Sequence, residues 1–256
     1  MLTVENLSFR YGRHLSPVLK NVCLSLEDGE IGILLGKNGA GKTTLFQNLL
    51  GISRPQGGTL LFDGRDMKKM SRKERAGKVA YVPQHIQFGA LSVYNSVLMG
   101  RIACFGLRAG EEDCRVTEKI LADMKLETYA SRNVEELSGG ERQKAAIARA
   151  LAQEPRLLIF DEPTGNLDIA NQQLIMEEAR KIAKEKNIGI LCSLHDLNQA
   201  LYFGDRFFFL KDGTIKYSGT GDIFSAEIIK DIFDIDVHII EAENRKIILG
   251  GKINED

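Results

Sequence analysis

The run Gly36 to Thr44 (GKNGAGKTT) has the residue types needed to bind phosphate groups. Its glycines permit positive φ and a close backbone approach, so successive N–H groups can face one set of anionic oxygens. Lys42 adds a full charge for β and γ phosphates, and the Thr43 hydroxyl is a hard oxygen ligand for Mg²⁺. The run therefore predicts a site for a nucleoside triphosphate with Mg²⁺, formed by Gly36, Asn38, Gly39, Ala40, Gly41, Lys42, Thr43 and Thr44.

The segments on either side of this loop must place it at the end of a strand and the start of a helix. Residues 31–35 are short and apolar enough for a buried strand, and residues 43–50 show helical spacing. A helix start adds partial positive charge to the predicted phosphate site. A chance glycine-rich turn is the alternative, but the pattern G-x-x-x-x-G-K-[ST] is matched at every fixed position and in this context.

An acidic pair, Asp161 and Glu162, follows the apolar run 157–160. Carboxylates at the end of a buried strand are costly unless a cation compensates them, and Mg²⁺ with a nucleotide would do so. We expect Asp161 to hold the metal directly or through water, and Glu162 to orient or deprotonate an attacking water. The alternative is a strand that ends in an exposed acidic turn.

Two further residues are candidates for nucleotide contacts, each with a structural alternative. His195 comes just after an apolar strand at 188–192 and could donate to a γ-phosphate, although a lone histidine there is as often structural. Tyr11 stands beside Gly12 before a loop and could stack on a nucleobase, although a loop tyrosine is more often a strand-end anchor.

A second glycine site lies at Ser138-Gly139-Gly140-Glu141, just before a strong helical pattern. Ser138 and Glu141 have the spacing of a capping box, and a capped helix alone would explain them. The helix start could also present N–H groups and a hydroxyl to an anion. One chain would then have two anion sites but only one Lys-Thr apparatus. A head-to-tail pair of identical chains, in which each Ser138 site covers the nucleotide of the other chain, resolves this imbalance.

The composition limits the partners of the chain. It has 256 residues, of which 43% are hydrophobic and 27% charged, with a net charge of -1 and a pI near 6.5. This balance provides no long-range field for nucleic acid, so no nucleic-acid partner is expected. The basic run 68–75 is interpreted as a solvated helix face. The four cysteines lack metal-site spacing and are interpreted as reduced thiols, mostly in the core. Neither a secretory signal nor a spanning helix is expected.

Hydrophobic periodicity predicts an α/β fold with a mostly parallel sheet, and the pattern G-x-x-x-x-G-K-[ST] identifies its core as that of a P-loop NTPase. An antiparallel β subdomain precedes and flanks the loop, and an α-helical subdomain at about 88–152 is inserted in the core, all within one domain spanning 1–256. Ligands gather at the carboxyl ends of parallel strands, where Lys42, Asp161, Glu162 and His195 are all expected. The supporting segments are alternating strands within 2–30, a hairpin at 57–64, strands at 79–82, 157–160 and 188–192, a helix at 169–186 and a hairpin at 206–217.

The order of these motifs resembles that of the nucleotide-binding subunit of ATP-binding cassette (ABC) transporters, and the resemblance covers essentially the whole chain. It identifies a Walker A loop at 36–43, a glutamine loop at Gln84, a signature at 137–141, a Walker B segment at 157–161 and a switch histidine at His195. The resemblance implies an ATPase that uses ATP and Mg²⁺ and works as a homodimer.

The resemblance also implies roles for individual residues. Tyr11 becomes the adenine stacker, and Asp168 lies in a loop, 165–168, that meets the opposite subunit. The implied catalytic residues are Lys42, Gln84, Glu162 and His195, the implied metal contacts are Thr43, Gln84 and Asp161, and the signature contacts to the nucleotide are Ser138, Gly139 and Gly140. The sequence departs from the family pattern at Lys37, where proline is frequent, and at Gly165-Asn166. Neither departure removes a catalytic group.

Within the family, residues 92–101, 167–172 and 194–200 look like those of importers of iron-siderophore, haem or cobalamin type. Importers of molybdate, zinc and manganese share parts of this pattern. The resemblance implies integral membrane permease subunits as partners, an indirect link to a substrate-binding protein, and a peripheral location on the cytoplasmic face of the inner or plasma membrane. The transported molecule never contacts such an ATPase, so these residues do not identify it.

Three functions outside transport are alternatives. A soluble ABC ATPase of iron-sulfur cluster assembly shares the same motifs. A chromosome-associated clamp is disfavoured, because no long heptad segment separates the two nucleotide motifs. A P-loop kinase or GTPase would leave Ser138 to Glu141 unexplained.

Overall fold

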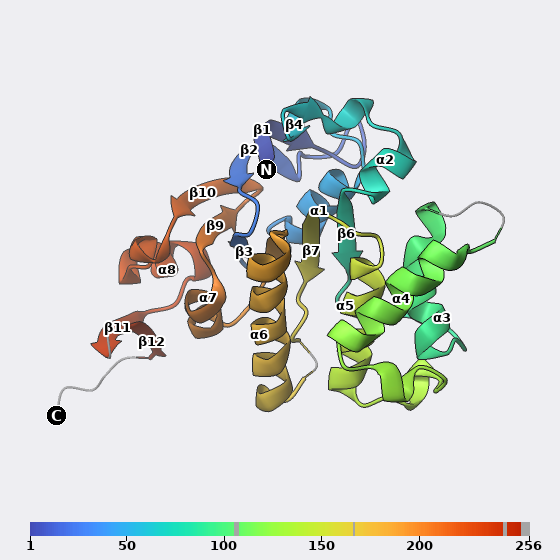
Figure 1. The fold of residues 1–256 in the computed structure, drawn as a ribbon. Coiled ribbons are helices and arrows are strands. Elements are labelled where there is room, and N and C mark those ends of the chain that lie inside the picture. The colour runs from blue at the N-terminus through green and yellow to red at the C-terminus, as the bar shows by residue number, and fades with distance from the viewer. Residues whose placement is uncertain (105–107, 166, 243–244, 252–256) are drawn as a thin grey trace.

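The computed structural model describes residues 1–104, 108–165, 167–242 and 245–251. At its centre is a six-stranded sheet in the order β10-β9-β3-β8-β7-β6 (Figure 1). Neighbouring strands from β9 to β6 run parallel, and β10 is antiparallel to β9 at one edge. The strands are β3 (Ile31–Leu35), β6 (Val79–Val82), β7 (Leu157–Asp161), β8 (Gly189–Ser193), β9 (Arg206–Lys211) and β10 (Thr214–Gly219).

A second, antiparallel sheet in the order β2-β1-β4-β5 lies at the top of Figure 1. Its longer strands alternate buried and solvent-facing residues, as the period-two pattern predicted. The strands are β1 (Leu2–Phe9), β2 (Leu19–Leu26), β4 (Gly57–Phe62) and β5 (Arg65–Asp66). A mostly parallel sheet together with this antiparallel sheet confirms the predicted fold class.

Helices cover the central sheet and fill the stretch between β6 and β7. The described residues of that stretch form three α-helices with short 3-10 turns, and an isolated bridge joins Ser92 to Asn133. These helices lie at the right of Figure 1. The α-helices of the structure are α1 (Lys42–Leu50), α2 (Arg72–Ala76), α3 (Val93–Leu98), α4 (Glu111–Asp123), α5 (Gly139–Leu151), α6 (Ile169–Lys186), α7 (Leu197–Phe203) and α8 (Ala226–Phe233).

Two apolar cores lie on opposite faces of the central sheet, because successive residues of a strand point to opposite sides. In β3, Ile33 belongs to the core formed with α3 to α7, whereas Leu34 belongs to the core formed with α1 and the antiparallel sheet. All five residues of β3, β7 and β8 are buried. The central strands are thus fixed from both sides, and this holds the loops at their ends in place.

After β8 and α7, the structure contains one hairpin that the sequence pattern predicted, followed by elements that it did not predict, α8 and the two strands of a second hairpin. The predicted hairpin at 206–217 corresponds to β9 and β10, and α8 follows it. The last hairpin is formed by β11 (Val237–Ala242) and β12 (Arg245–Gly250), beside α7 at the lower left of Figure 1.

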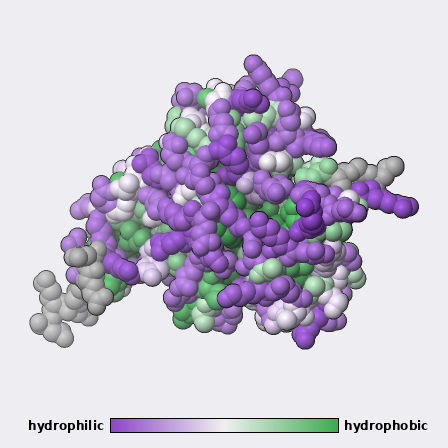
Figure 2. Space-filling model, in the orientation of Figure 1, coloured by the Kyte–Doolittle hydropathy of each residue, from purple (hydrophilic) through white to green (hydrophobic). Residues whose placement is uncertain are grey.

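The face of the molecule seen in Figure 2 is mostly hydrophilic, with small apolar areas between charged ones. Among the described residues, no helix combines the length and the apolar character needed to span a bilayer. The prediction that the cysteines lie mostly in the core is wrong, because only Cys192 is buried, and Cys23 and Cys104 are exposed.

Candidate functional site

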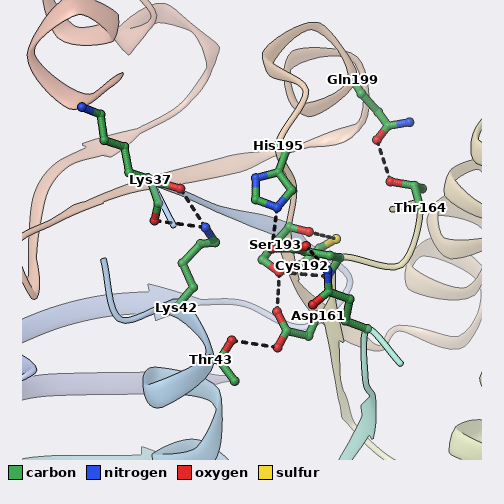
Figure 3. Close-up of polar contacts among 12 residues, drawn as sticks. Lys37, Lys42, Thr43, Asp161, Thr164, Cys192, Ser193, His195 and Gln199 are labelled. Carbon is green, nitrogen blue, oxygen red and sulfur yellow. Dashed lines mark hydrogen bonds and ion pairs between the residues drawn. The ribbon is translucent and has the colours of Figure 1, made fainter. Parts of the chain in front are cut away.

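Three neighbouring strands, β3, β8 and β7, end at the same edge of the central sheet. The segments that follow them carry the glycine-rich loop, His195 and Glu162 respectively. In the ladder, Ser193 at the end of β8 is paired with Leu34 on one side and with Asp161 on the other. Figure 3 shows the resulting cluster of polar side chains, drawn from segments far apart in the sequence.

The backbone of the glycine-rich loop is shaped as a receptor for anionic oxygens. Gly39 and Gly41 have φ values of 82° and 111°, in the left-handed region that favours glycine. A Cβ atom at Gly36 would lie 2.3 Å from the carbonyl oxygen of Leu210, so only glycine fits there. Helix α1 begins after Gly41 without a side-chain cap and without an acidic residue in its first turn. Its first N–H groups are therefore directed at the loop, where a phosphate would accept from them.

The side chain of Lys42 is buried and folds back over its own loop. Its Nζ donates to the carbonyl oxygens of Gly36 at 2.7 Å and Lys37 at 3.4 Å (Figure 3). Burial lowers the pKa of Lys42, and the nearby carboxylates of Glu162 and Asp161 act in the opposite direction. A phosphate placed in the loop would add negative charge directly beside an ammonium group whose hydrogen bonds here go to two backbone carbonyls.

Asp161 is buried at the end of β7, with hydroxyl groups around it. Thr43 Oγ1 donates to its Oδ2 at 3.1 Å, and the Tyr81 hydroxyl donates to the same oxygen at 3.2 Å. Ser193 Oγ donates to Oδ1 at 2.8 Å. Burial and the charge of Asp161 raise the pKa of Tyr81, so the phenol remains a donor.

A hydroxyl oxygen and a carboxylate oxygen 3.1 Å apart suit Mg²⁺. This ion usually takes one or two carboxylates and completes its shell with water and substrate phosphates. Within the described ranges no three His, Cys, Asp or Glu side chains cluster as a metal site. The pair formed by Thr43 and Asp161, together with a bound nucleotide, is the arrangement that fits the ion.

Glu162 lies where three segments converge. Gln84 Nε2 donates to its Oε2 at 2.5 Å, and His195 Nε2 lies 2.5 Å from its Oε1. The backbone N–H of Glu162 donates to Ser193 Oγ at 2.9 Å. Its φ of 50° is unusual for a residue with a long side chain. The structure therefore brings Gln84, Glu162 and His195 together, and a local backbone constraint aims the carboxylate at them.

Tyr11 lies against the first turn of α1, next to the glycine-rich loop. Its hydroxyl group is 3.0 Å from Thr44 Oγ1 and donates to Gln47 Oε1 at 3.3 Å. The ring makes an edge contact with Phe9, at 4.9 Å between centroids, and 59% of the residue is exposed. An aromatic face is thus available for a flat ligand beside the phosphate loop.

The Ser138 segment starts α5 with the predicted capping box. Ser138 Oγ donates to Glu141 Oε2 at 2.7 Å, and Ser138 is exposed. The pKa of Glu141 is lowered by hydrogen bonds from Tyr129 and Ser138. The ionised carboxylate therefore accepts the hydrogen bonds that complete the capping box.

The start of α5 packs on the start of α6. A Cβ atom at Gly140 would lie 2.2 Å from Asn171 Oδ1, so a larger residue there would have to displace the Asn171 side chain. Asp168 caps α6 by accepting from the Asn171 N–H at 2.8 Å, and its second oxygen accepts from Asn171 Nδ2 at 2.9 Å. The first residues of α5 and α6 are therefore neighbours, and α6 follows the end of β7 through a short segment. The neighbouring Asn166 lies outside the described residues.

Ser193 and Tyr81 were not recognised as site residues from the sequence. Ser193 bonds to both acidic residues, and Tyr81 bonds to Asp161. The available signal was a polar residue at the end of an otherwise apolar strand: Ser193 after Ile190-Leu191-Cys192. Its partners could not be found without the strand order, because β7 and β8 are joined through a long helix.

Comparison with known proteins places these features in a family. Residues 19–165 match the family model described as ABC transporter. An uncharacterized ABC transporter ATP-binding protein of Methanocaldococcus jannaschii is 41% identical over 93% of each chain. The iron(3+)-hydroxamate import ATP-binding protein FhuC of Bacillus subtilis is 36% identical, over 93% of this chain and 90% of its own length.

Solved structures with a similar fold are also described as ABC transporters or their ATP-binding cassettes. A transporter described as being of metal-chelate ABC type, in an inward-facing conformation, superimposes with a TM-score of 0.84. It is 29% identical and covers 99% of this chain and 98% of that chain. A dimeric ATP-binding cassette in a post-hydrolysis state, bound to ADP and Pi, superimposes with a TM-score of 0.73, 29% identity, and coverage of 88% and 100%.

Proposed function

The chain belongs to the ABC transporter family as an ATP-hydrolysing subunit of an importer, and we propose that the cargo of this importer is a metal chelate, such as an iron-siderophore, haem or cobalamin. The cargo proposal is supported by the relative named for iron(3+)-hydroxamate import and by the structure of metal-chelate type. The position of Glu162 is the observation that best supports ATP hydrolysis. Its two carboxylate oxygens lie 2.5 Å from Gln84 Nε2 and 2.5 Å from His195 Nε2, next to the phosphate loop.

The residues of the loop bind the phosphate tail in this proposal. The N–H groups at the start of α1 and the Lys42 ammonium group hold the β and γ phosphates, and Tyr11 stacks on the adenine. The cradle comprises Gly36, Asn38, Gly39, Ala40, Gly41, Lys42, Thr43 and Thr44. Lys42 would exchange its two carbonyl partners for phosphate oxygens, which remain close to the same loop.

Glu162 accepts a proton from the attacking water or orients that water. Thr43, Asp161 and Gln84 would hold Mg²⁺, which would supply positive charge that compensates the phosphate groups. His195 donates to the γ-phosphate. In the structure Gln84 and His195 both contact Glu162, so these two side chains would turn from the carboxylate to the metal and the γ-phosphate in the proposed reaction.

The working form in this proposal is a head-to-tail dimer with two nucleotides at its seam. In this dimer Ser138, Gly139, Gly140 and Asp168, which lie at the adjoining starts of α5 and α6, would face the nucleotide of a second copy rather than their own. A dimeric cassette among the similar structures supports this arrangement. ATP would pull the copies together, and hydrolysis would release them.

The remaining partners are integral membrane permease subunits, reached from the cytoplasmic face, and a substrate-binding protein that acts through them. The loop after Gln84 and the helices between β6 and β7 would carry the motion to the permease, because Gln84 contacts the site at one end of that segment.

Uptake by cells that carry the Glu162→Gln chain tests the cargo proposal. Iron-siderophore, haem and cobalamin uptake are measured separately, in cells that produce either the wild-type or the variant chain. We expect the variant to abolish uptake of one of these chelates, with integral membrane proteins copurifying with both chains. Unchanged uptake of all three, or copurification with cytosolic proteins only, would contradict the proposal; the second result would point to a soluble assembly ATPase.

A further inference from the structure

We propose that Ser193 is a positioning residue that sets the orientation of both acidic groups of the hydrolytic site. This inference rests on the roles proposed for Asp161 and Glu162. Ser193 is fully buried at the last position of β8. Its hydroxyl donates to Asp161 Oδ1 at 2.8 Å and accepts from the Glu162 N–H at 2.9 Å, so one oxygen connects consecutive residues of the neighbouring strand (Figure 3).

The bond to Asp161 decides which carboxylate oxygen is left for other ligands. Because Oδ1 is engaged by Ser193, Oδ2 faces the hydroxyl groups of Tyr81 at 3.2 Å and Thr43 at 3.1 Å, and with Thr43 Oγ1 it forms the pair suited to Mg²⁺. Without the Ser193 hydroxyl, the buried Oδ1 would lose this donor, and the carboxylate could rotate. Groups that orient a metal-binding carboxylate in this way contribute measurably to metal affinity.

The bond to Glu162 acts on the backbone. Glu162 has a φ of 50°, a conformation that residues with a Cβ rarely adopt and that the surroundings must maintain. The Ser193 oxygen fixes the N–H of this peptide, and the side chain then projects toward Gln84 and His195. A hydroxyl group supplies both functions because it can donate one hydrogen bond and accept another at the same time.

Alternatively, Ser193 could simply satisfy buried polar groups and contribute to stability alone. Cys192 provides a matched control, because it is the preceding residue of the same strand, is also buried, and belongs to the apolar core on the helix-covered face of the sheet. Cys192→Ala removes one buried heavy atom, as Ser193→Ala does, but leaves the acidic pair untouched. Ser193→Thr retains the hydroxyl group.

The test measures the ATPase kcat and KM and the melting temperature of the full chain. It also measures the affinity for a fluorescent ATP analogue with Mg²⁺ and with EDTA. For Ser193→Ala we expect kcat to fall about tenfold or more with little change in KM, and the gain in nucleotide affinity from Mg²⁺ to fall roughly three- to tenfold. Cys192→Ala should leave kcat and the Mg²⁺ gain within about twofold of wild type, and Ser193→Thr should restore most of both.

The inference would be overturned if Ser193→Ala kept the wild-type kcat and Mg²⁺ gain. It would also be overturned if Cys192→Ala, at a similar fall in melting temperature, lost as much kcat and Mg²⁺ gain as Ser193→Ala. If threonine proves too large for the site, the comparison of the two alanine variants still distinguishes a positioning role from a contribution to stability alone. Failure of the proposed function would look different, since the wild-type chain would then show no Mg²⁺-dependent ATP hydrolysis, alone or with its membrane subunits.

Discussion

The proposed chemistry of the site depends on Glu162. Both of its carboxylate oxygens are engaged, by Gln84 and by His195, and its side chain is only 13% exposed. In this arrangement the carboxylate is held near the phosphate loop but is occupied by protein partners. Nucleotide binding must therefore rearrange these contacts before a water can reach the carboxylate.

Replacing Glu162 by glutamine should separate binding from hydrolysis. The amide is nearly the same size, so the loop and its nucleotide contacts are retained, but it cannot accept the proton from water. We expect kcat for ATP hydrolysis to fall roughly 10²- to 10⁴-fold, with the affinity for ATP changed less than about threefold. Steady-state ATPase assays and equilibrium nucleotide binding measure the two quantities; a variant with more than a tenth of the wild-type kcat would rule out this role.

The proposed stacking of adenine on Tyr11 can also be tested by substitution. Stacking of a base on an aromatic ring contributes about 1–3 kcal/mol, so Tyr11→Ala should weaken ATP binding about tenfold. Tyr11→Phe is the matched control, because it retains the ring and loses only the contacts of the hydroxyl with Thr44 and Gln47. Its affinity should stay within about twofold of wild type. Equal losses in both variants would assign the effect to the hydroxyl contacts and contradict stacking.

At the scale of elements, the local sequence predicted whether a segment is a helix or a strand. Tertiary contacts determine which segments are neighbours. The apolar runs of β3 and β7 and the helix at 169–186 appear where they were expected, because their patterns leave few alternatives. Gln84 and Ser193 meet Glu162 only because β6, β7 and β8 are neighbours in the sheet, and no local pattern contains that order. Likewise β12 is held by Asn198 on α7, which donates to the Ile248 carbonyl at 3.0 Å.

The close approach of Gly100 to α5 sets the packing of the helices between β6 and β7. A Cβ atom at Gly100 would lie 2.0 Å from the backbone oxygen of Arg149, which cannot move without shifting the helix. Gly100→Ala should therefore lower the free energy of unfolding by about 1–3 kcal/mol, measured by denaturant titration. For Gly77→Ala, where the nearest atoms are 3.7 Å away, we expect no loss. Equal effects in both variants would contradict this packing.

Helix α8 is attached to the β9–β10 hairpin through Asp231. Lys211 Nζ and Lys216 Nζ donate to its carboxylate at 3.1 and 2.6 Å, and the Tyr217 hydroxyl donates at 3.2 Å. The hydrogen bonds from Lys216 and Lys211 lower the pKa of Asp231 to about 2 from an ordinary value of 3.8. A lowered folded-state pKa stabilises the fold above the unfolded-state pKa, and this contribution is lost as pH falls from about 4 toward 2.

Asp231→Asn should therefore flatten the pH dependence of stability between about pH 4 and pH 2 and lower stability at neutral pH. Thermal melts over this range measure both effects. Asp212→Asn makes the same charge change in the exposed β9–β10 turn and serves as the control. If the two variants give the same acid profile, Asp231 does not anchor α8 through its charge.

At the scale of the whole molecule, the proposed function requires a site that is completed by surfaces of two copies. The phosphate loop, Asp161 and Glu162 lie at the ends of the central strands, whereas Ser138 and Asp168 cap the starts of α5 and α6. The capping box at Ser138 and the close approach of Gly140 to Asn171 connect these two helix starts, which form the second surface of the proposed site. Two copies related by a twofold axis would complete two sites at once.

The most direct test is the mass of the Glu162→Gln chain in solution, measured by light scattering during gel filtration with and without ATP. A single chain has a mass of 28.5 kDa. We predict a monomer without ATP, a dimer of twice that mass with ATP, and a monomer in both conditions when Ser138→Arg is added. Dimers that form equally well with Ser138→Arg, or no ATP-dependent dimer even with the membrane subunits present, would contradict a site shared between two copies.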